Sequence, residues 1–217
     1  MAFDKTLFNK NFDFPFKAAV ANNMRIATRA FDSFMADNSD FLSDADELYG
    51  RLLAHAVKHQ FFKAASSTAP YFLVSGQEVN AYKTNAVFLN TPDYITNICR
   101  TDKPQKLPCR AKYKQQLALG NREDEIQLEF ATLPGSNELQ AAFPKKYALL
   151  TYCYKNSEFR HLNIVVPDWR FQSILHSDNL FGQITEFYNY VPEEIVEENV
   201  ASLKKDLVQV VNKNIIL

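Results

Sequence analysis

The chain has 217 residues, of which 24 are Lys or Arg and 25 are Asp or Glu, so its formal net charge is −1. This balance favours no partner of strong charge, whether nucleic acid, an acidic protein or a membrane surface. Only five residues are glycine and all five are isolated, which excludes the clustered glycines of a P-loop, a dinucleotide-binding fingerprint or a nucleophile elbow.

The three cysteines, Cys99, Cys109 and Cys153, are an odd number without the spacing of a metal site. Unpaired cysteines favour a reducing compartment. The first 17 residues carry charged side chains where a secretory signal has its apolar core. No run approaches the ~20 apolar residues that a membrane span needs. We therefore expect a cytoplasmic protein with no membrane segment and no bound cofactor.

Two amphipathic helices are predicted near the N-terminus, after an irregular arm over residues 1–14. Pro15 fits the first turn of a helix that runs to about Ala36, with apolar residues at three- and four-residue steps. Ser43, with Asp46 three residues later, resembles a capping box that starts a second helix. The short acidic connection between them predicts an αα-hairpin.

Short strands are expected after these helices. Gly76-Gln77 fits a type II′ turn between two of them. Further along, Thr91-Pro92-Asp93-Tyr94 resembles the start of a helix.

The most apolar stretch, residues 146–170, predicts a central β-hairpin. Its first strand is apolar on both faces, which is typical of the interior of a covered sheet. A turn at Asn156-Ser157 would place Thr151 opposite Leu162, so that Tyr147, Leu149 and Thr151 share a face with Leu162, Ile164 and Val166. We expect the apolar pattern to specify this register.

Residues 100–122 are the most asymmetric part of the chain, with seven bases and one acid, and they are predicted to form an exposed insertion in the sheet. The segment either contacts phosphates, with a tyrosine stacked on a base, or docks an acidic protein. Alternatively, its charges are solvated and balance acids elsewhere, such as the Glu-rich start of the last helix. The candidate binding residues are Arg100, Lys103, Lys106, Arg110, Lys112, Tyr113 and Lys114.

The C-terminal part, residues 177–213, predicts two helices. A short one follows Ser177-Asp178. The last one opens at Pro192 with glutamates first and lysines later, an order that suits the helix dipole. Its apolar stripe either docks on the chain's own sheet or forms a homodimer seam or partner groove.

His55 and His59 are one helical turn apart, a spacing that lets two imidazoles bind one metal ion. Glu47 lies two turns before His55, but the sequence supplies no complete ligand set. Two boundary histidines, hydrogen-bonded or solvated, are the simpler interpretation.

Asp93, Glu158 and Asp168 are the acids that a metal-dependent nuclease would use, since such enzymes place acids near strand ends and a lysine two residues after one of them. The chain has arginine at that place after both Glu158 and Asp168, and arginine does not deprotonate. No serine lies in a nucleophile elbow and no cysteine has an adjacent base.

We predict an α+β fold, with an N-terminal αα-hairpin packed on a mostly antiparallel sheet of five to seven strands and a C-terminal helix. We expect one domain over residues 1–217, comprising an arm and two helices (1–66), the sheet (71–170) and the last helices (177–213).

The predicted function is that of a non-enzymatic binding or regulatory protein, acting through a protein or nucleic-acid partner. It would use the basic segment and an aromatic surface formed by Phe181, Phe187, Tyr188 and Tyr190. A metal-dependent nuclease, or another hydrolase acting on nucleic acid, is the alternative.

Overall fold

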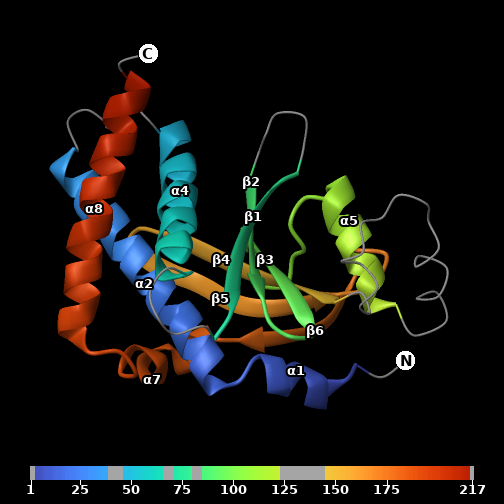
Figure 1. Cartoon of the computed structure of the whole chain (residues 1–217). Coiled ribbons are helices and arrows are strands. Elements are labelled where there is room, and N and C mark those ends of the chain that lie inside the picture. The colour runs from blue at the N-terminus through green and yellow to red at the C-terminus, as the bar shows by residue number, and fades with distance from the viewer. Residues whose placement is uncertain (1–2, 39–45, 66–70, 80–84, 123–144, 216–217) are drawn as a thin grey trace. The chain divides into compact units, whose positions relative to one another are not determined.

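The computed structural model describes residues 3–38, 46–65, 71–79, 85–122 and 145–215 (Figure 1). The chain divides into two compact units. Unit 1 consists of residues 1–11, 75–153 and 160–179, and unit 2 of residues 12–74, 154–159 and 180–217. The single domain stays a prediction.

The described residues contain six α-helices and a six-stranded sheet that is mostly antiparallel, which confirms the predicted α+β class. The helices are α1 (Lys5–Asn11), α2 (Phe14–Asp37), α4 (Asp46–Ala65), α5 (Lys112–Ala118), α7 (Ile184–Tyr188) and α8 (Glu193–Ile215), with short 3-10 helices η1 (Leu119–Asn121) and η3 (Phe181–Gln183). The strands are β1 (Leu73–Glu78), β2 (Asn85–Asn90), β3 (Tyr94–Arg100), β4 (Lys146–Lys155), β5 (Glu158–Pro167) and β6 (Ile174–Asn179).

The strands lie in the sheet in the order in which they occur in the chain. β2 and β3 pair antiparallel, as do β5 and β6, whereas β3 and β4 are parallel, with Ile95 opposite Tyr147 and Cys99 opposite Thr151. Parallel neighbours cannot be joined by a tight turn and need a long crossover connection. This connection carries the basic segment and α5.

The central hairpin turns at Asn156 and Ser157, as predicted. Both have positive φ, 54° and 58°, the conformation of a type I′ turn, whose twist matches that of the flanking strands. Seven consecutive β5 residues, from His161 to Pro167, are buried. Side chains on both faces of this strand are therefore covered.

The predicted apolar face of the hairpin differs from the observed packing in its β5 member. Tyr147 and Leu149 pack in one buried cluster with Val165, not with Ile164 or Val166. The apolar pattern did not identify which β5 residues join this cluster, because β5 is apolar and buried on both faces.

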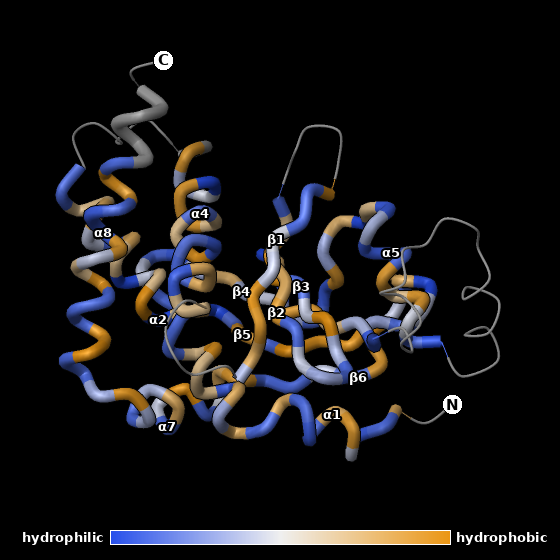
Figure 2. Tube along the Cα trace, in the orientation of Figure 1, coloured by the Kyte–Doolittle hydropathy of each residue, from blue (hydrophilic) through white to orange (hydrophobic). Residues whose placement is uncertain are grey.

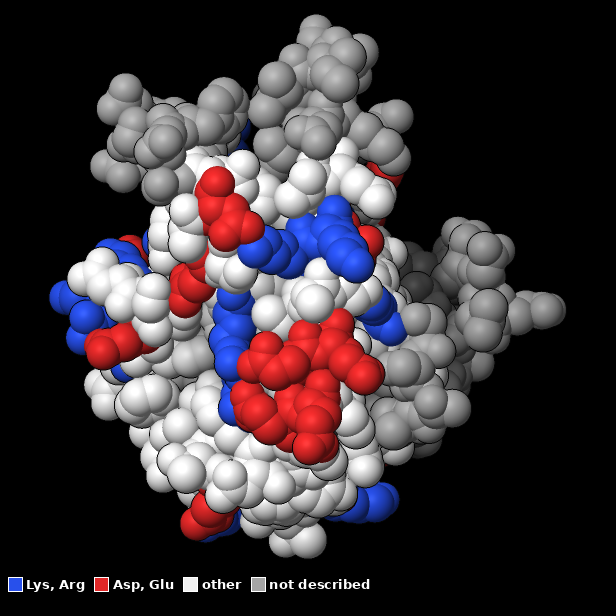
Figure 3. All heavy atoms as spheres, turned by 90° about the vertical axis from the view of Figure 1, so that its left-hand side faces the viewer, with Lys and Arg blue, Asp and Glu red and all other residues white. Residues whose placement is uncertain are grey.

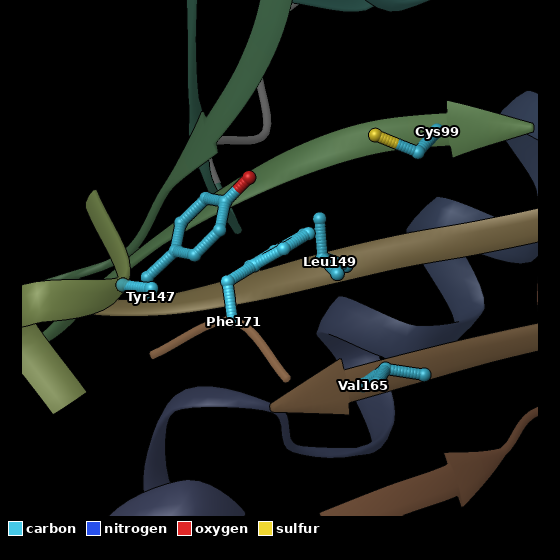
Figure 4. Packing of buried hydrophobic residues seen from close by; sticks show 6 residues of the cluster. Cys99, Tyr147, Leu149, Val165 and Phe171 are labelled. Carbon is cyan, nitrogen blue, oxygen red and sulfur yellow. The ribbon is translucent and has the colours of Figure 1, made fainter. Parts of the chain in front are cut away.

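The buried cluster of unit 1 lies between α5 and the sheet (Figure 4). Its members come from three strands, α5 and the turn after β5: Cys99, Ala118, Tyr147, Leu149, Val165 and Phe171. Phe171 has a positive φ of 55°, which costs a non-glycine residue about 1–2 kcal/mol. Burial of its ring to 1% exposure offsets this cost.

In unit 2, α4, α7 and α8 pack against α2. Asp13 caps α2 by accepting a hydrogen bond from Phe16 N (3.0 Å), and a proline stands in the first turn, as predicted. The buried Asn22 side chain donates to Phe187 O (2.6 Å) and so fixes α7. Its neighbour Asn23 accepts a structural hydrogen bond from Gln60 Nε2 (2.8 Å).

The last helix follows its predicted stripe. Val196, Val200, Leu203 and Leu207 are buried, at steps of four, three and four residues. Figure 2 shows the alternation of hydrophobic and hydrophilic residues along α8.

Several predicted local elements are wrong. The N-terminal arm contains helix α1, and β1 runs straight through Gly76. Thr91 does not start a helix: its N–H donates to Tyr94 O (3.0 Å), and its hydroxyl accepts from Tyr94 N (3.2 Å), in a tight turn that leads into β3. Ser177 lies within β6, and Ser43 lies outside the described residues.

Candidate functional site

The basic segment runs along β5 on one side of the sheet. Three side-chain hydrogen bonds mark its course in chain order: Thr101 Oγ1 with His161 Nε2 (2.9 Å), Asn163 Nδ2 to Pro104 O (3.2 Å), and Asn121 Nδ2 to Pro167 O (2.8 Å). The six residue steps between the first and last partners on β5 correspond to about 20 Å of strand. The segment is therefore bound to the sheet on one side and exposed on the other.

The exposed side carries five of the seven predicted binding residues: Arg100, Lys103, Lys106, Arg110 and Lys112. The other two are engaged within the fold. Lys114 is 9% exposed and donates to Cys109 O (3.2 Å). Tyr113 donates its hydroxyl hydrogen to Asn97 Oδ1 (3.2 Å), and its ring makes a T-shaped contact with Phe88. The stacking role predicted for Tyr113 therefore conflicts with its contacts.

A second aromatic group lies where the basic segment reaches the end of β5, and the sequence analysis did not identify it. The Trp169 indole is contacted by two guanidinium groups, Arg122 at 4.9 Å and Arg170 at 4.5 Å from the ring centroid. Both arginines are exposed and the indole is half-buried. We call these three residues the Trp169 platform.

Asn121 holds the platform to the sheet. Its amide donates to Tyr147 O (2.9 Å) and Pro167 O (2.8 Å), and its oxygen accepts from Tyr147 N (2.8 Å). One side chain thereby connects η1 to the start of β4 and the end of β5. Because Arg122 follows Asn121 directly and Trp169 lies two residues after Pro167, these bonds bring the two platform residues together.

Charge is divided unequally between the two units. Unit 1 has 14 Lys and Arg and 11 Asp and Glu, a net charge of +3, whereas unit 2 has 10 and 14, a net charge of −4. Five of the acids in unit 1 belong to residues 123–144, outside the described part. The described residues of unit 1 thus hold 13 bases and 6 acids.

Two acids of α8 are paired within unit 2. Arg25 and Arg29 of α2 both form ion pairs with Glu193, and Arg29 also pairs with Glu197. The Arg29 hydrogen bond is the main reason that the pKa of Glu193 is lowered. Figure 3 shows Asp and Glu side chains gathered in one patch on this face, with Lys and Arg side chains beside them. Balance of the basic segment by the acids of the last helix stays a prediction.

The predicted aromatic surface of unit 2 is only partly exposed. Phe187 is fully buried, while Phe181 is 42% and Tyr190 46% exposed. Tyr188 lies under the Arg25 guanidinium, 4.6 Å from the ring centroid. The four residues do not form one exposed surface.

His55 and His59 lie side by side on α4, with ring centroids 6.1 Å apart. His59 Nε2 and Lys63 Nζ each lie 3.3 Å from Asp206 Oδ2, so this carboxylate is shared by a histidine and a lysine. Burial lowers the pKa of His55, and the neighbouring His59 and Lys58 add to the effect. Within the described ranges, no three His, Cys, Asp or Glu residues are grouped as a metal site requires.

The three acids proposed for a nuclease do not converge. Asp93 Oδ2 accepts from Asn11 Nδ2 (2.8 Å). Asp168 Oδ1 accepts from Ser173 N (2.8 Å) and so shapes the turn before β6. Glu158 begins β5, at the opposite end of the strand from Asp168.

No protein-family model matches this chain, and neither a curated protein nor a solved structure matches it. Among the residues that the structure describes, no helix has the length and apolar character needed to span a membrane. The cytoplasmic location and dimerisation through the last helix stay predictions.

Proposed function

We propose that this chain is a non-enzymatic nucleic-acid-binding protein that holds a single strand on unit 1. The Trp169 platform would stack on one nucleobase, and the exposed Lys and Arg side chains along β5 would contact the phosphates. The observation that carries the proposal is the pair of exposed arginines on the only tryptophan of the chain. Trp and Arg are the side chains that stack best on nucleobases.

The interaction energies favour replacement of one arginine by a nucleobase on the Trp169 indole. An exposed cation–π contact is worth about 0.5–1 kcal/mol. Stacking of a base on an aromatic side chain is worth about 1–3 kcal/mol. A base therefore displaces one guanidinium from the indole, and the freed arginine pairs with the adjacent phosphate.

The basic segment along β5 supplies the phosphate contacts. Its length of about 20 Å corresponds to roughly six phosphates at duplex spacing, and to fewer in an extended strand. A single strand fits better than a duplex, because the bases of a duplex are already stacked on one another. The unequal charge of the units supports the same partner, since unit 1 carries the positive charge.

Tryptophan fluorescence tests the proposal directly, because Trp169 is the only tryptophan. Titration with an oligodeoxythymidine of about twelve nucleotides should quench the emission as a base stacks. The logarithm of the affinity should fall with the logarithm of salt with a slope of about −2 to −3.5, as expected for three to five phosphate contacts. Heparin supplies charge without bases and separates simple polyanion binding from stacking.

Three alanine variants sharpen the test, read by anisotropy of a labelled oligonucleotide. Trp169→Ala should weaken binding by about ten-fold or more, the equivalent of one stacked base. Arg170→Ala should weaken it and make the salt slope less steep by about 0.7. Arg51→Ala makes the same charge change on an exposed position of unit 2 and should leave affinity unchanged.

Two outcomes would contradict the proposal. One is an unchanged emission spectrum in about 50 mM salt, where phosphate contacts are strongest. The other is an equal loss of affinity in Arg51→Ala and Arg170→Ala, which would show that net charge alone matters. Binding to heparin and to an acidic polypeptide, without quenching by the oligonucleotide, would favour the acidic protein partner instead.

A further inference from the structure

Three exposed aromatic side chains from distant parts of the chain meet on unit 2. Phe14 begins α2, Tyr71 precedes β1, and Tyr190 follows α7. Their side chains are 45%, 40% and 46% exposed, respectively. We call these three residues the Tyr190 cluster. All of them belong to unit 2, whereas the Trp169 platform and the basic segment belong to unit 1.

Contacts between the rings hold the Tyr190 cluster together. The ring centroids of Phe14 and Tyr190 are 5.7 Å apart, with an angle of 77° between the ring planes. The hydroxyls of Tyr71 and Tyr190 form a hydrogen bond of 3.4 Å, which is the main reason that the pKa of Tyr71 is raised, and the Asp13 carboxylate adds to the effect. Phe14 also packs on the fully buried Phe187, with centroids 5.3 Å apart. The exposed rings are therefore anchored to the core of unit 2.

Exposed neighbouring rings are typical of an interaction surface. Single exposed apolar residues are normal on a protein, whereas contiguous ones mark binding sites, and aromatic residues are enriched there. Elsewhere in this chain, guanidinium groups lie over partly exposed rings: Arg25 is 4.6 Å from the Tyr188 centroid, and Arg122 and Arg170 contact Trp169. The same chemistry at the Tyr190 cluster points to an arginine that a partner supplies.

The charges around the cluster favour a cationic partner. Unit 2 has a net charge of −4. The exposed Asp13 directly precedes Phe14, and the exposed Glu186 and Glu194 lie four residues before and four residues after Tyr190. The negative face of an aromatic ring attracts cations by itself. Ring faces and carboxylates of unit 2 thus select the same sign of charge.

We propose that the Tyr190 cluster docks an arginine-containing segment of a basic protein partner, with a guanidinium group stacked on the exposed rings. Arginine suits the site better than lysine, because its planar guanidinium stacks on aromatic faces and is more weakly hydrated. The carboxylates of unit 2 would pair with further cations of the segment and steer its approach. The two units would then bind partners of opposite charge, phosphates on unit 1 and cations on unit 2.

The test measures binding of a fluorescein-labelled peptide of about twelve residues, alternating glycine and arginine, to the full-length chain by anisotropy in about 100 mM salt. A peptide with glutamine in place of arginine has no positive charge and should not bind. Phe14→Leu and Tyr190→Leu should each weaken binding of the arginine peptide by about two- to five-fold, the equivalent of one exposed cation–π contact. Leucine keeps the side chain apolar and the net charge unchanged, so this loss reports the ring faces.

Phe3→Leu is the matched control, because Phe3 is a partly exposed ring of unit 1 that stacks on His176, and it should leave peptide affinity unchanged. The proposal is overturned by equal binding of the glutamine peptide, by an equal loss in Phe3→Leu, or by unchanged affinity in both cluster variants. A dimer mass in light scattering that Tyr190→Leu reduces to a monomer would identify a second copy as the occupant and would also overturn it. If Phe14→Leu fails to fold, Tyr71→Leu takes its place.

Discussion

Replacing Asn121 with alanine should destabilise the protein more than any exposed asparagine substitution. The side chain makes three hydrogen bonds, to Tyr147 O, Tyr147 N and Pro167 O, at 2.8–2.9 Å. Tyr147 is fully buried, so water does not readily replace the lost partner. Each bond contributes about 0.5–1.5 kcal/mol, and the three together predict a loss of about 2–4 kcal/mol in the free energy of unfolding.

Urea denaturation followed by far-ultraviolet circular dichroism measures this loss as a lower midpoint at unchanged slope. Asn199→Ala is the matched control, because Asn199 makes one exposed hydrogen bond to Ile195 O (2.8 Å), and its change should stay within about 0.5 kcal/mol. Asn121→Asp keeps the acceptor for Tyr147 N but places a carboxylate against two carbonyl oxygens, so it should be no milder than alanine. Equal stability of Asn121→Ala and Asn199→Ala would refute the reasoning.

Two further predictions concern packing and pH. A Cβ at Gly120 would lie 2.4 Å from the backbone oxygen of Lys145, whereas one at Gly182 would meet nothing within 4 Å. Gly120→Ala should therefore cost about 1–3 kcal/mol in thermal or urea denaturation, with Gly182→Ala near neutral; similar losses in both would contradict this. Burial lowers the pKa of His55 and of His161, so the unfolded chain binds protons first and stability falls as pH drops from 7 to 5. His55→Gln should make that dependence shallower, and a urea series showing equal pH slopes in variant and wild type would count against a buried neutral His55.

The long helices of unit 2 could be predicted from the sequence because their signals agree. The apolar period, a proline in the first turn of α2 and the order of charges along α8 all indicate the same boundaries within one or two residues. The type I′ turn at Asn156-Ser157 was also predictable, since short polar residues tolerate positive φ. Local chemistry alone decides these elements.

Helix α5 is not among the predicted elements, because the prolines of the basic segment disfavour a helix. Pro104 and Pro108 lie outside the helix, which begins at Lys112. Residues two apart on a helix point in different directions, which explains why Lys112 is exposed while Lys114 is buried. A charge count treats these two lysines as equivalent. Only the helical geometry shows that Lys112 is on the surface and that Lys114 is buried.

The Trp169 platform depends on tertiary structure. Arg122 and Trp169 are far apart in the chain, and no periodic pattern connects them. Their proximity follows from Asn121, and nothing in the sequence distinguishes this asparagine from an ordinary loop residue. Its three bonds require that β4 begins and β5 ends at the same edge of the sheet. The sequence supplied the arginines and the indole, but the pairing of strands brought them together.

The net charge of −1 conceals the division on which the proposed function depends. A value near zero argues against a nucleic-acid partner only if the charges are mixed over one surface. Here the difference between the units is seven charges, from +3 in unit 1 to −4 in unit 2. Glu193 and Glu197 are already paired with Arg25 and Arg29 inside unit 2. Phosphates are the counter-charges that the proposal assigns to exposed unit 1 cations such as Lys103 and Lys106.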